Sequence, residues 1–200
     1  MELRFHFDPA CPWSWGTYLW LEQIAQRSDD LAVRFGLVSL LELNKGNEMP
    51  DDIREVLSQS RRLQRVLSVL IEAERWMDVG RIYSQIGSVT FESGRHLDTE
   101  AVGQVCSETC SEEARFQLDD EALDDQVVKM HQSAMALGGA GVGSPIISIE
   151  GGSHGFYGPI VDRRLDEREA DTLFSIVKSA FELTSFYELK RGHAGNPSFG

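Results

Sequence analysis

The chain has 200 residues, of which 42% are hydrophobic and 26% charged, so it is expected to form one globular domain, with or without a large insertion; disordered and low-complexity classes are excluded. Its 19 basic and 32 acidic residues give a formal net charge of −13, which disfavours nucleic acid and anionic membranes as partners. There is neither a signal-peptide pattern nor an apolar run of roughly 18 to 20 residues, so we expect a cytoplasmic protein.

The first segment predicts a β-α-β unit. Residues 3–7 alternate apolar and polar side chains and end at a turn, which is typical of a strand. A helix is expected directly afterwards, because Pro12 stands in its first turn, where a missing N–H costs nothing, and apolar residues then recur at helical spacing. Residues 32–41 alternate and then become apolar, which predicts a second, central strand parallel to the first.

The middle of the chain, residues 42–138, shows helical periodicity only. Asp51 and Asp52 are candidate N-caps of the first long helix, and the last helix is expected to stop at Gly138-Gly139. This segment is therefore predicted to be an inserted, all-helical subdomain.

Strand patterns return after residue 139. Residues 145–150 and 155–157 predict an antiparallel pair of strands, and a final helix starts at an aspartate version of the capping box, Asp166 with Glu169. The predicted fold class is α/β, with a β-α-β unit, a helical insertion and a β-β-α unit. Residues 1–41 and 139–200 form one domain in this prediction.

Cys11 is the leading candidate for a reactive group. It stands where the first strand meets the first helix, and the N–H groups that begin a helix lack partners there and carry partial positive charge. We expect this position to lower the pKa of the thiol and to make the thiolate a nucleophile at neutral pH. His6, on the first strand, is interpreted as a residue of the strand surface.

Ser14 stands three residues after Cys11, where a dithiol oxidoreductase carries its second cysteine. A hydroxyl donates a hydrogen bond to a thiolate, but it does not act as the resolving sulfur in disulfide exchange. Turnover then requires a low-molecular-weight thiol, a distant cysteine, or chemistry in which Cys11 forms no disulfide. Cys106 and Cys110, four residues apart on a predicted helix, are interpreted as structural thiols, with resolution of a Cys11 adduct as the alternative; no metal site is expected.

Four short stretches carry a family resemblance, and they are spread over nearly the whole length of the chain. They are Phe-Asp-Pro-Ala-Cys-Pro-Trp-Ser-Trp at 7–15, Gly-Ser-Pro at 143–145, Gly-Phe-Tyr-Gly-Pro at 155–159 and Phe-Tyr-Glu-Leu-Lys-Arg at 186–191. They resemble the DsbA family of thioredoxin-fold oxidoreductases, in the branch that includes mycothiol-dependent nitroreductases. The resemblance implies a thioredoxin fold that a helical domain interrupts.

The resemblance also implies a site and a co-substrate. The family's nucleophile falls on Cys11 and its cis-proline on Pro145, with the Ser144 peptide group opposite the sulfur. A serine at Ser14 departs from the Cys-Pro-Trp-Cys of that branch and is similar to kappa-class glutathione transferases and 2-hydroxychromene-2-carboxylate isomerases, whose motif has serine in place of Cys11. The implied catalytic residues are Cys11 and Ser14, and the implied substrate contacts are Pro12, Trp13, Ser144 and Pro145.

The leading hypothesis is a thiol-disulfide oxidoreductase with one nucleophilic cysteine. It needs no tightly bound cofactor; mycothiol or glutathione is the expected co-substrate, and a small thiol or mixed disulfide the expected partner. One alternative is a kappa-type transferase or isomerase, in which the site activates the sulfur of bound glutathione. Another is a binding module on a decayed redox site. The resemblance leaves a homodimer open.

Overall fold

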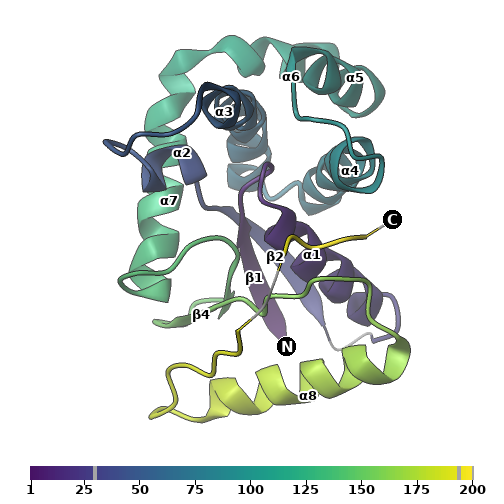
Figure 1. Ribbon diagram of the computed structural model, residues 1–200, viewed down its shortest axis with the longest axis vertical. Helices are drawn as coiled ribbons and strands as arrows, with labels where there is room; N and C mark the ends of the chain where they lie inside the picture. The colour runs from purple at the N-terminus through teal and green to yellow at the C-terminus, as the bar shows by residue number, and fades with distance from the viewer. Residues whose placement is uncertain (29–30, 193–194, 200) are drawn as a thin grey trace.

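The computed structural model describes residues 1–28, 31–192 and 195–199, and its centre is a four-stranded sheet (Figure 1). The strands are β1 (Glu2–Phe7), β2 (Ala32–Leu37), β3 (Ile146–Ile149) and β4 (Gly155–Tyr157). Their order is β2-β1-β3-β4; β1 is parallel to β2 and antiparallel to β3, and β3 is antiparallel to β4. The predicted order of elements and the β3–β4 hairpin are confirmed.

The prediction that the second strand is central was wrong, because β2 is an edge strand and β1 is the one that pairs on both sides. The strand is also shorter than predicted and ends at Leu37. Helices pack against β2, and they account for the apolar character that the prediction attributed to strand neighbours.

Helices lie at both ends of the chain and fill the interval between β2 and β3. The segment from α2 to α7, here called the helical insertion, stands over one end of the sheet in Figure 1, and α8 lies at the other end. The helices are α1 (Pro12–Ala25), α2 (Leu40–Leu43), α3 (Asp51–Glu72), α4 (Trp76–Gly87), α5 (Thr99–Thr109), α6 (Glu112–Phe116), α7 (Asp124–Gly138) and α8 (Glu167–Glu182), with a π-helical turn at Ser88–Glu92 and 3-10 turns at Gln117–Asp119 and Glu121–Leu123.

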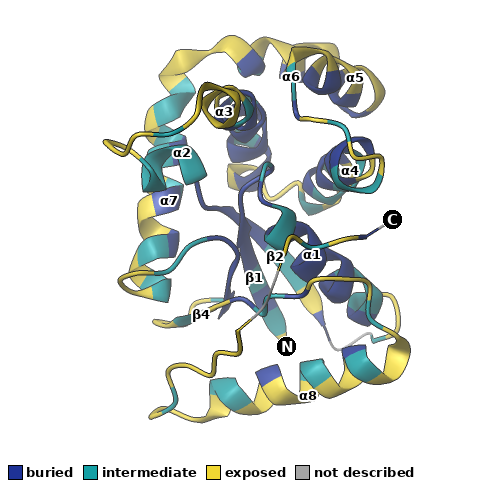
Figure 2. Ribbon diagram, in the orientation of Figure 1, coloured by how far each residue is buried: buried dark blue, intermediate teal, exposed yellow. Residues whose placement is uncertain are grey.

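One continuous hydrophobic cluster joins the sheet to the helical insertion. Leu3, Phe5 and Phe7 on β1 are fully buried, and the cluster continues through α1 into α3, α4 and α5. Figure 2 shows the same distribution, with buried ribbon at the centre and a largely exposed outer face on α8. The insertion therefore shares its core with the sheet, and burial of this shared apolar surface holds the two parts together.

The helix ends follow the local signals with one exception. Asp166 and Glu169 form the predicted capping box at the start of α8, and α7 ends at Gly138 as expected. The N-cap of α3 is Pro50, so Asp51 and Asp52 lie instead in the first turn, where carboxylates favourably meet the positive end of the helix. Among the described residues, no helix combines the length and the apolar character needed to cross a membrane.

Candidate active site

Cys11 lies at the N-terminus of α1, as its sequence position predicts. It is the N-cap residue, with extended backbone angles of φ −87° and ψ 111°, and Pro12 is the first residue of the helix. The N–H of Cys11 donates to the carbonyl of Asp8 at 3.0 Å, which closes the turn between β1 and α1. This turn directs the thiol toward the loop that precedes β3.

The loop before β3 supplies the opposite side of the site. The Ser144–Pro145 peptide bond is cis, and the Cys11 thiol donates to the carbonyl oxygen of Ser144, with 3.4 Å between Sγ and that oxygen. The hydroxyl oxygens of Ser14 and Ser144 are 2.7 Å apart, and Oγ of Ser144 also accepts from the N–H of Asp8 at 3.0 Å. Ser144 thus ties together the end of β1, the start of α1 and the loop, and it brings four of the predicted site residues into contact.

The expectation of a low pKa for Cys11 was wrong in this state of the protein. Only 4% of the residue is exposed, and this burial raises the pKa of the Cys11 thiol. Hydrogen bonds from the Ser14 hydroxyl and from the N–H groups of Ser14 and Trp13 lower the pKa in part, whereas the neighbouring Asp8 raises it further. Loss of water around the sulfur therefore outweighs the helix N-terminus, and Cys11 is a neutral thiol that donates to Ser144.

Aromatic residues lie around the site; some are buried in the hydrophobic core and others are partly exposed. Trp15 and Trp20 are buried in the core, whereas Trp13 is half-buried beside Cys11. Tyr157 is 45% exposed, because it is the last residue of the edge strand β4. Its pKa is raised by burial of the ring and, to a smaller extent, by the charge of Cys11.

Asp8 is a part of the site that the sequence reasoning missed. The residue is 1% exposed, and its carboxylate accepts four hydrogen bonds. The donors are the N–H groups of Ala10 and Leu40, both at 2.7 Å, the Ser60 hydroxyl at 2.6 Å and the Gln64 amide at 3.2 Å. Asp8 therefore links the Cys11 turn to α2 and α3. An aspartate before a proline is typical of a turn, and only the packing of α3 shows that this one is buried.

We expect Asp8 to make the protein less stable as the pH rises above about 4. Burial raises the pKa of Asp8 above its ordinary value of 3.8, so the folded chain retains a proton that the unfolded chain has already lost. The free energy of unfolding then falls as the pH rises through this window. Urea unfolding of the wild type and of Asp8→Asn at several pH values from 4 to 7 measures the effect. The wild type should lose stability relative to the variant, and parallel profiles would contradict the assignment.

A second buried polar group, the hydroxyl of Tyr83 on α4, was also missed. Tyr83 is fully buried, and its hydroxyl has no hydrogen-bond partner among the described residues. Burial, together with the charges of Cys11 and Asp8, raises the pKa of Tyr83 well above its ordinary value. Its spacing on α4 is that of a core residue, so no sequence signal distinguishes it from one.

His6 does not belong to the Cys11 site, and its interpretation as a surface residue was wrong. It is 4% exposed, because the helices that cover this face of the sheet enclose it. Its Nε2 lies 3.4 Å from Oγ of Ser148, and burial, assisted by Arg4, lowers the pKa of His6 to about 4. The imidazole is therefore neutral at physiological pH.

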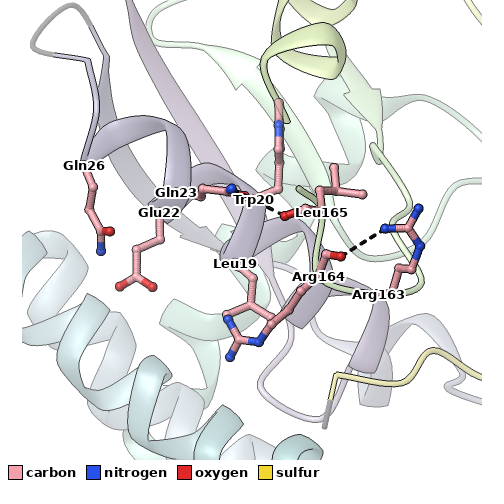
Figure 3. A pocket seen from close by; sticks show the side chains of 9 residues that line it. Leu19, Trp20, Glu22, Gln23, Gln26, Arg163, Arg164 and Leu165 are labelled. Atoms are coloured by element: carbon pink, nitrogen blue, oxygen red, sulfur yellow. Dashed lines mark hydrogen bonds between the residues drawn. The ribbon is translucent and has the colours of Figure 1, made fainter. Parts of the chain in front are cut away.

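A pocket of about 220 Å³ lies along α1, and Figure 3 shows its lining. Trp20 and Gln23 contribute from α1, and residues 163–165 close the other side. The amide of Gln23 donates to the carbonyl of Leu165 at 3.4 Å. None of the predicted site residues lines this pocket.

Cys106 and Cys110 lie in the helical insertion. Cys106 is in α5 and Cys110 is the residue that follows this helix; both are buried, and all three cysteines of the chain are free thiols. No hydrogen bond between described residues links either of them to Cys11. Nor do three or more His, Cys, Asp or Glu side chains come together as a metal site in the described part of the chain.

Comparison with known proteins assigns the chain to a family. Residues 10–191 match the model of the Rv2466c-like family, described as mycothiol-dependent nitroreductase Rv2466c. An uncharacterised protein, Rv2286c of Mycobacterium tuberculosis, is 28% identical over 191 residues, which cover 94% of this chain and 80% of that protein.

Solved structures show the same fold at low sequence identity. The cytosolic disulfide reductase DsbM from Pseudomonas aeruginosa with GSH has a TM-score of 0.55 and 16% identity, over 92% of this chain and 100% of DsbM. A 2-hydroxychromene-2-carboxylate isomerase has a TM-score of 0.57 and 16% identity, over 90% and 94%. The probable DsbA oxidoreductase SCO1869 from Streptomyces coelicolor has a TM-score of 0.56 and 17% identity, over 97% and 95%. The fold is thus the thioredoxin fold of DsbA-like proteins, and the chain belongs to the Rv2466c-like family.

Proposed function

We propose that this chain is a thiol oxidoreductase in which Cys11 is the reacting sulfur and a low-molecular-weight thiol is the co-substrate. The observation that carries the proposal is the contact of the Cys11 thiol with the Ser144 carbonyl, at the N-terminus of α1 and next to Pro145. Family membership supports thiol redox chemistry and favours mycothiol over glutathione. The three free thiols fit a reducing compartment such as the cytoplasm.

Substrate binding at Ser144 would favour the thiolate form of Cys11 over the neutral thiol. The Ser144 carbonyl accepts a hydrogen bond from the thiol, and it is also the group to which the backbone N–H of a cysteinyl substrate can donate. A substrate that takes this acceptor removes the partner that stabilises the protonated form of Cys11. The N–H groups of Trp13 and Ser14 remain beside the sulfur and stabilise the thiolate. Pro12 and Trp13, half-buried at the rim, would contact the rest of the substrate.

The reaction has two thiol-disulfide exchanges. The Cys11 thiolate attacks the sulfur of a mixed disulfide that belongs to the low-molecular-weight thiol, and the substrate thiolate leaves and takes up a proton. A second molecule of the low-molecular-weight thiol then attacks the adduct, which restores the Cys11 thiolate and releases the symmetrical disulfide. Ser14 does not resolve the adduct, because it has no sulfur; its hydroxyl hydrogen-bonds the thiolate of Cys11.

Mass spectrometry of the protein after exposure to oxidised glutathione, or to the disulfide of mycothiol, tests the proposal. Trypsin releases Cys11 in the peptide of residues 5–27, which contains no other cysteine. We expect one thiol adduct on this peptide, removal of the adduct by the same thiol in reduced form, and no adduct in Cys11→Ser. An unmodified Cys11 under conditions that modify a free cysteine would overturn the proposal and favour a site that binds a thiol without bonding to it.

A further inference from the structure

We propose that Ser144 is a positioning residue for Cys11: its hydroxyl donates to the oxygen of Ser14 and so keeps the Ser14 proton directed at the Cys11 sulfur. The inference deepens the proposed function and rests on it, because it concerns the same thiol. It gives a role to the side chain of Ser144, whereas the proposed mechanism uses only its backbone carbonyl.

The contacts of the Ser144 side chain are short and buried. Its Oγ lies 2.7 Å from Oγ of Ser14, and it accepts from the N–H of Asp8 at 3.0 Å. Ser14 is 0% exposed and Ser144 is 4% exposed, so solvent water does not supply alternative partners. The two hydroxyls therefore depend on each other and on the surrounding groups for their hydrogen bonds.

The direction of the hydrogen bond between the two hydroxyls follows from the available donors and acceptors. The N–H of Asp8 can only donate, so it occupies one acceptor position of the Ser144 oxygen. If Ser14 also donated to this oxygen, the Ser144 proton would have no acceptor among the described residues, and a buried donor without a partner is destabilising. If Ser144 donates to Ser14 instead, both protons have acceptors, because the Ser14 proton is then available to the sulfur.

Ser14 faces the Cys11 sulfur because of the places that the two residues occupy in α1. Cys11 is the N-cap and Ser14 is the third helical residue, and side chains at these two positions lie on the same side of the first turn. The Cys11 thiol in turn donates to the carbonyl of Ser144, with 3.4 Å between Sγ and the oxygen. Cys11, Ser14 and Ser144 thus form a closed ring in which each residue donates to the next.

This ring is arranged in advance for the thiolate. When a substrate takes the Ser144 carbonyl as its acceptor and Cys11 loses its proton, the Ser14 proton already points toward the negative sulfur, so no side chain has to turn. Without the Ser144 hydroxyl, the Ser14 hydroxyl could rotate toward a backbone carbonyl of its own helix, as helical serines do. The thiolate would then lose part of its support.

The rate of Cys11 alkylation at several pH values from 6.5 to 8.5 tests the inference. The full-length chain is treated with iodoacetamide, and the tryptic peptide of residues 5–27 reports on Cys11 alone. Below the pKa of Cys11 the rate follows the thiolate fraction, so one unit of pKa changes it tenfold. We expect Ser14→Ala to slow alkylation by about 10- to 100-fold, and Ser144→Ala by about 2- to 10-fold.

The opposite bond direction predicts the opposite results. If Ser14 donated to Ser144, then Ser144→Ala would free the Ser14 proton for the sulfur and accelerate alkylation, and Ser14→Ala would leave the rate unchanged. A loosened loop would also accelerate alkylation, because it would expose the sulfur. Either acceleration in Ser144→Ala, or an unchanged rate in Ser14→Ala, would overturn the proposal.

The double variant shows whether Ser144 acts through Ser14. Adding Ser144→Ala to Ser14→Ala should change the rate by less than about twofold, and an equal effect of Ser144→Ala in both backgrounds would contradict the inference. Asp8, Tyr83 and Tyr157 are the titratable groups whose charges interact with Cys11, and all three stay in place throughout.

Ser148→Ala is the matched control. Ser148 is a buried serine of β3, and its hydroxyl lies beside His6, so its loss should leave the alkylation rate of Cys11 within about twofold of the wild-type rate. The outcome is separable from that of the proposed function. A glutathione adduct on Cys11 without these rate changes would contradict the role of Ser144 alone, whereas the rate changes without an adduct would contradict disulfide exchange alone.

Discussion

Replacing Cys11 with serine is expected to reduce the rate of mixed-disulfide reduction by at least about 10³-fold. Serine preserves the size of the side chain and can donate to the Ser144 carbonyl as the thiol does, so the local structure should remain intact. Its oxygen neither ionises near neutral pH nor forms a disulfide, and the first exchange cannot occur. The rate is measured with a glutathionylated peptide as substrate and reduced glutathione or mycothiol as the second thiol.

A matched cysteine variant separates this loss from a general loss of thiols. Cys110→Ser removes a buried free thiol of the helical insertion but leaves the turn between β1 and α1 unchanged. We expect Cys110→Ser to reduce the mixed disulfide within about twofold of the wild-type rate, because Cys110 has no hydrogen bond to the Cys11 site. If Cys11→Ser retained the wild-type rate and Cys110→Ser lost it, Cys11 would not be the reacting sulfur, and Cys110 would be.

Replacing Gly87 with alanine is expected to destabilise the fold by about 1 to 3 kcal/mol, the cost of overpacking a core. Gly87 is the last residue of α4, and a Cβ built there would lie 2.2 Å from the ring of Trp15. Trp15 is 2% exposed, and its ring packs against Tyr18 and Tyr83, so it has no room to withdraw. The midpoint of urea unfolding reports the change in stability.

Gly103 is the matched control for Gly87. It lies inside α5, and a Cβ built there meets no atom within 4 Å. Both glycines are in helical backbone. Alanine loses less conformational freedom than glycine on folding, so the substitution by itself should stabilise the fold by about 0.5 to 1 kcal/mol at either position. We therefore expect Gly103→Ala to raise the urea midpoint and Gly87→Ala to lower it. Equal shifts in the two variants would show that contact with Trp15 does not limit position 87.

The Gly87 contact also matters for the site. Trp15 lies on α1 one residue after Ser14, and its ring packs against Tyr83 of α4. Overpacking against Trp15 in Gly87→Ala would therefore strain α1 close to the Cys11 turn. The helix that begins at Cys11 therefore packs on the core that the helical insertion shares with the sheet.

The elements of this protein follow from local sequence, and so does the position of its candidate nucleophile. Alternation over residues 3–7, proline after Cys11 and the capping box at Asp166 act on neighbouring residues, so they predict β1 and the starts of α1 and α8 without any knowledge of distant segments. The family resemblance added the loop at Ser144, which lies more than one hundred residues from Cys11.

The tertiary structure decided the properties that depend on burial. β2 lies at the edge of the sheet, because strand order depends on pairing across the whole chain. His6 and Asp8 are buried because helices from the insertion cover them, and the direction of the Cys11 pKa follows from the same enclosure. Desolvation is a sum over atoms contributed by segments far apart in sequence, so no local pattern contains it. The sequence alone therefore determined where the thiol stands, and only the folded chain determined that the thiol is neutral.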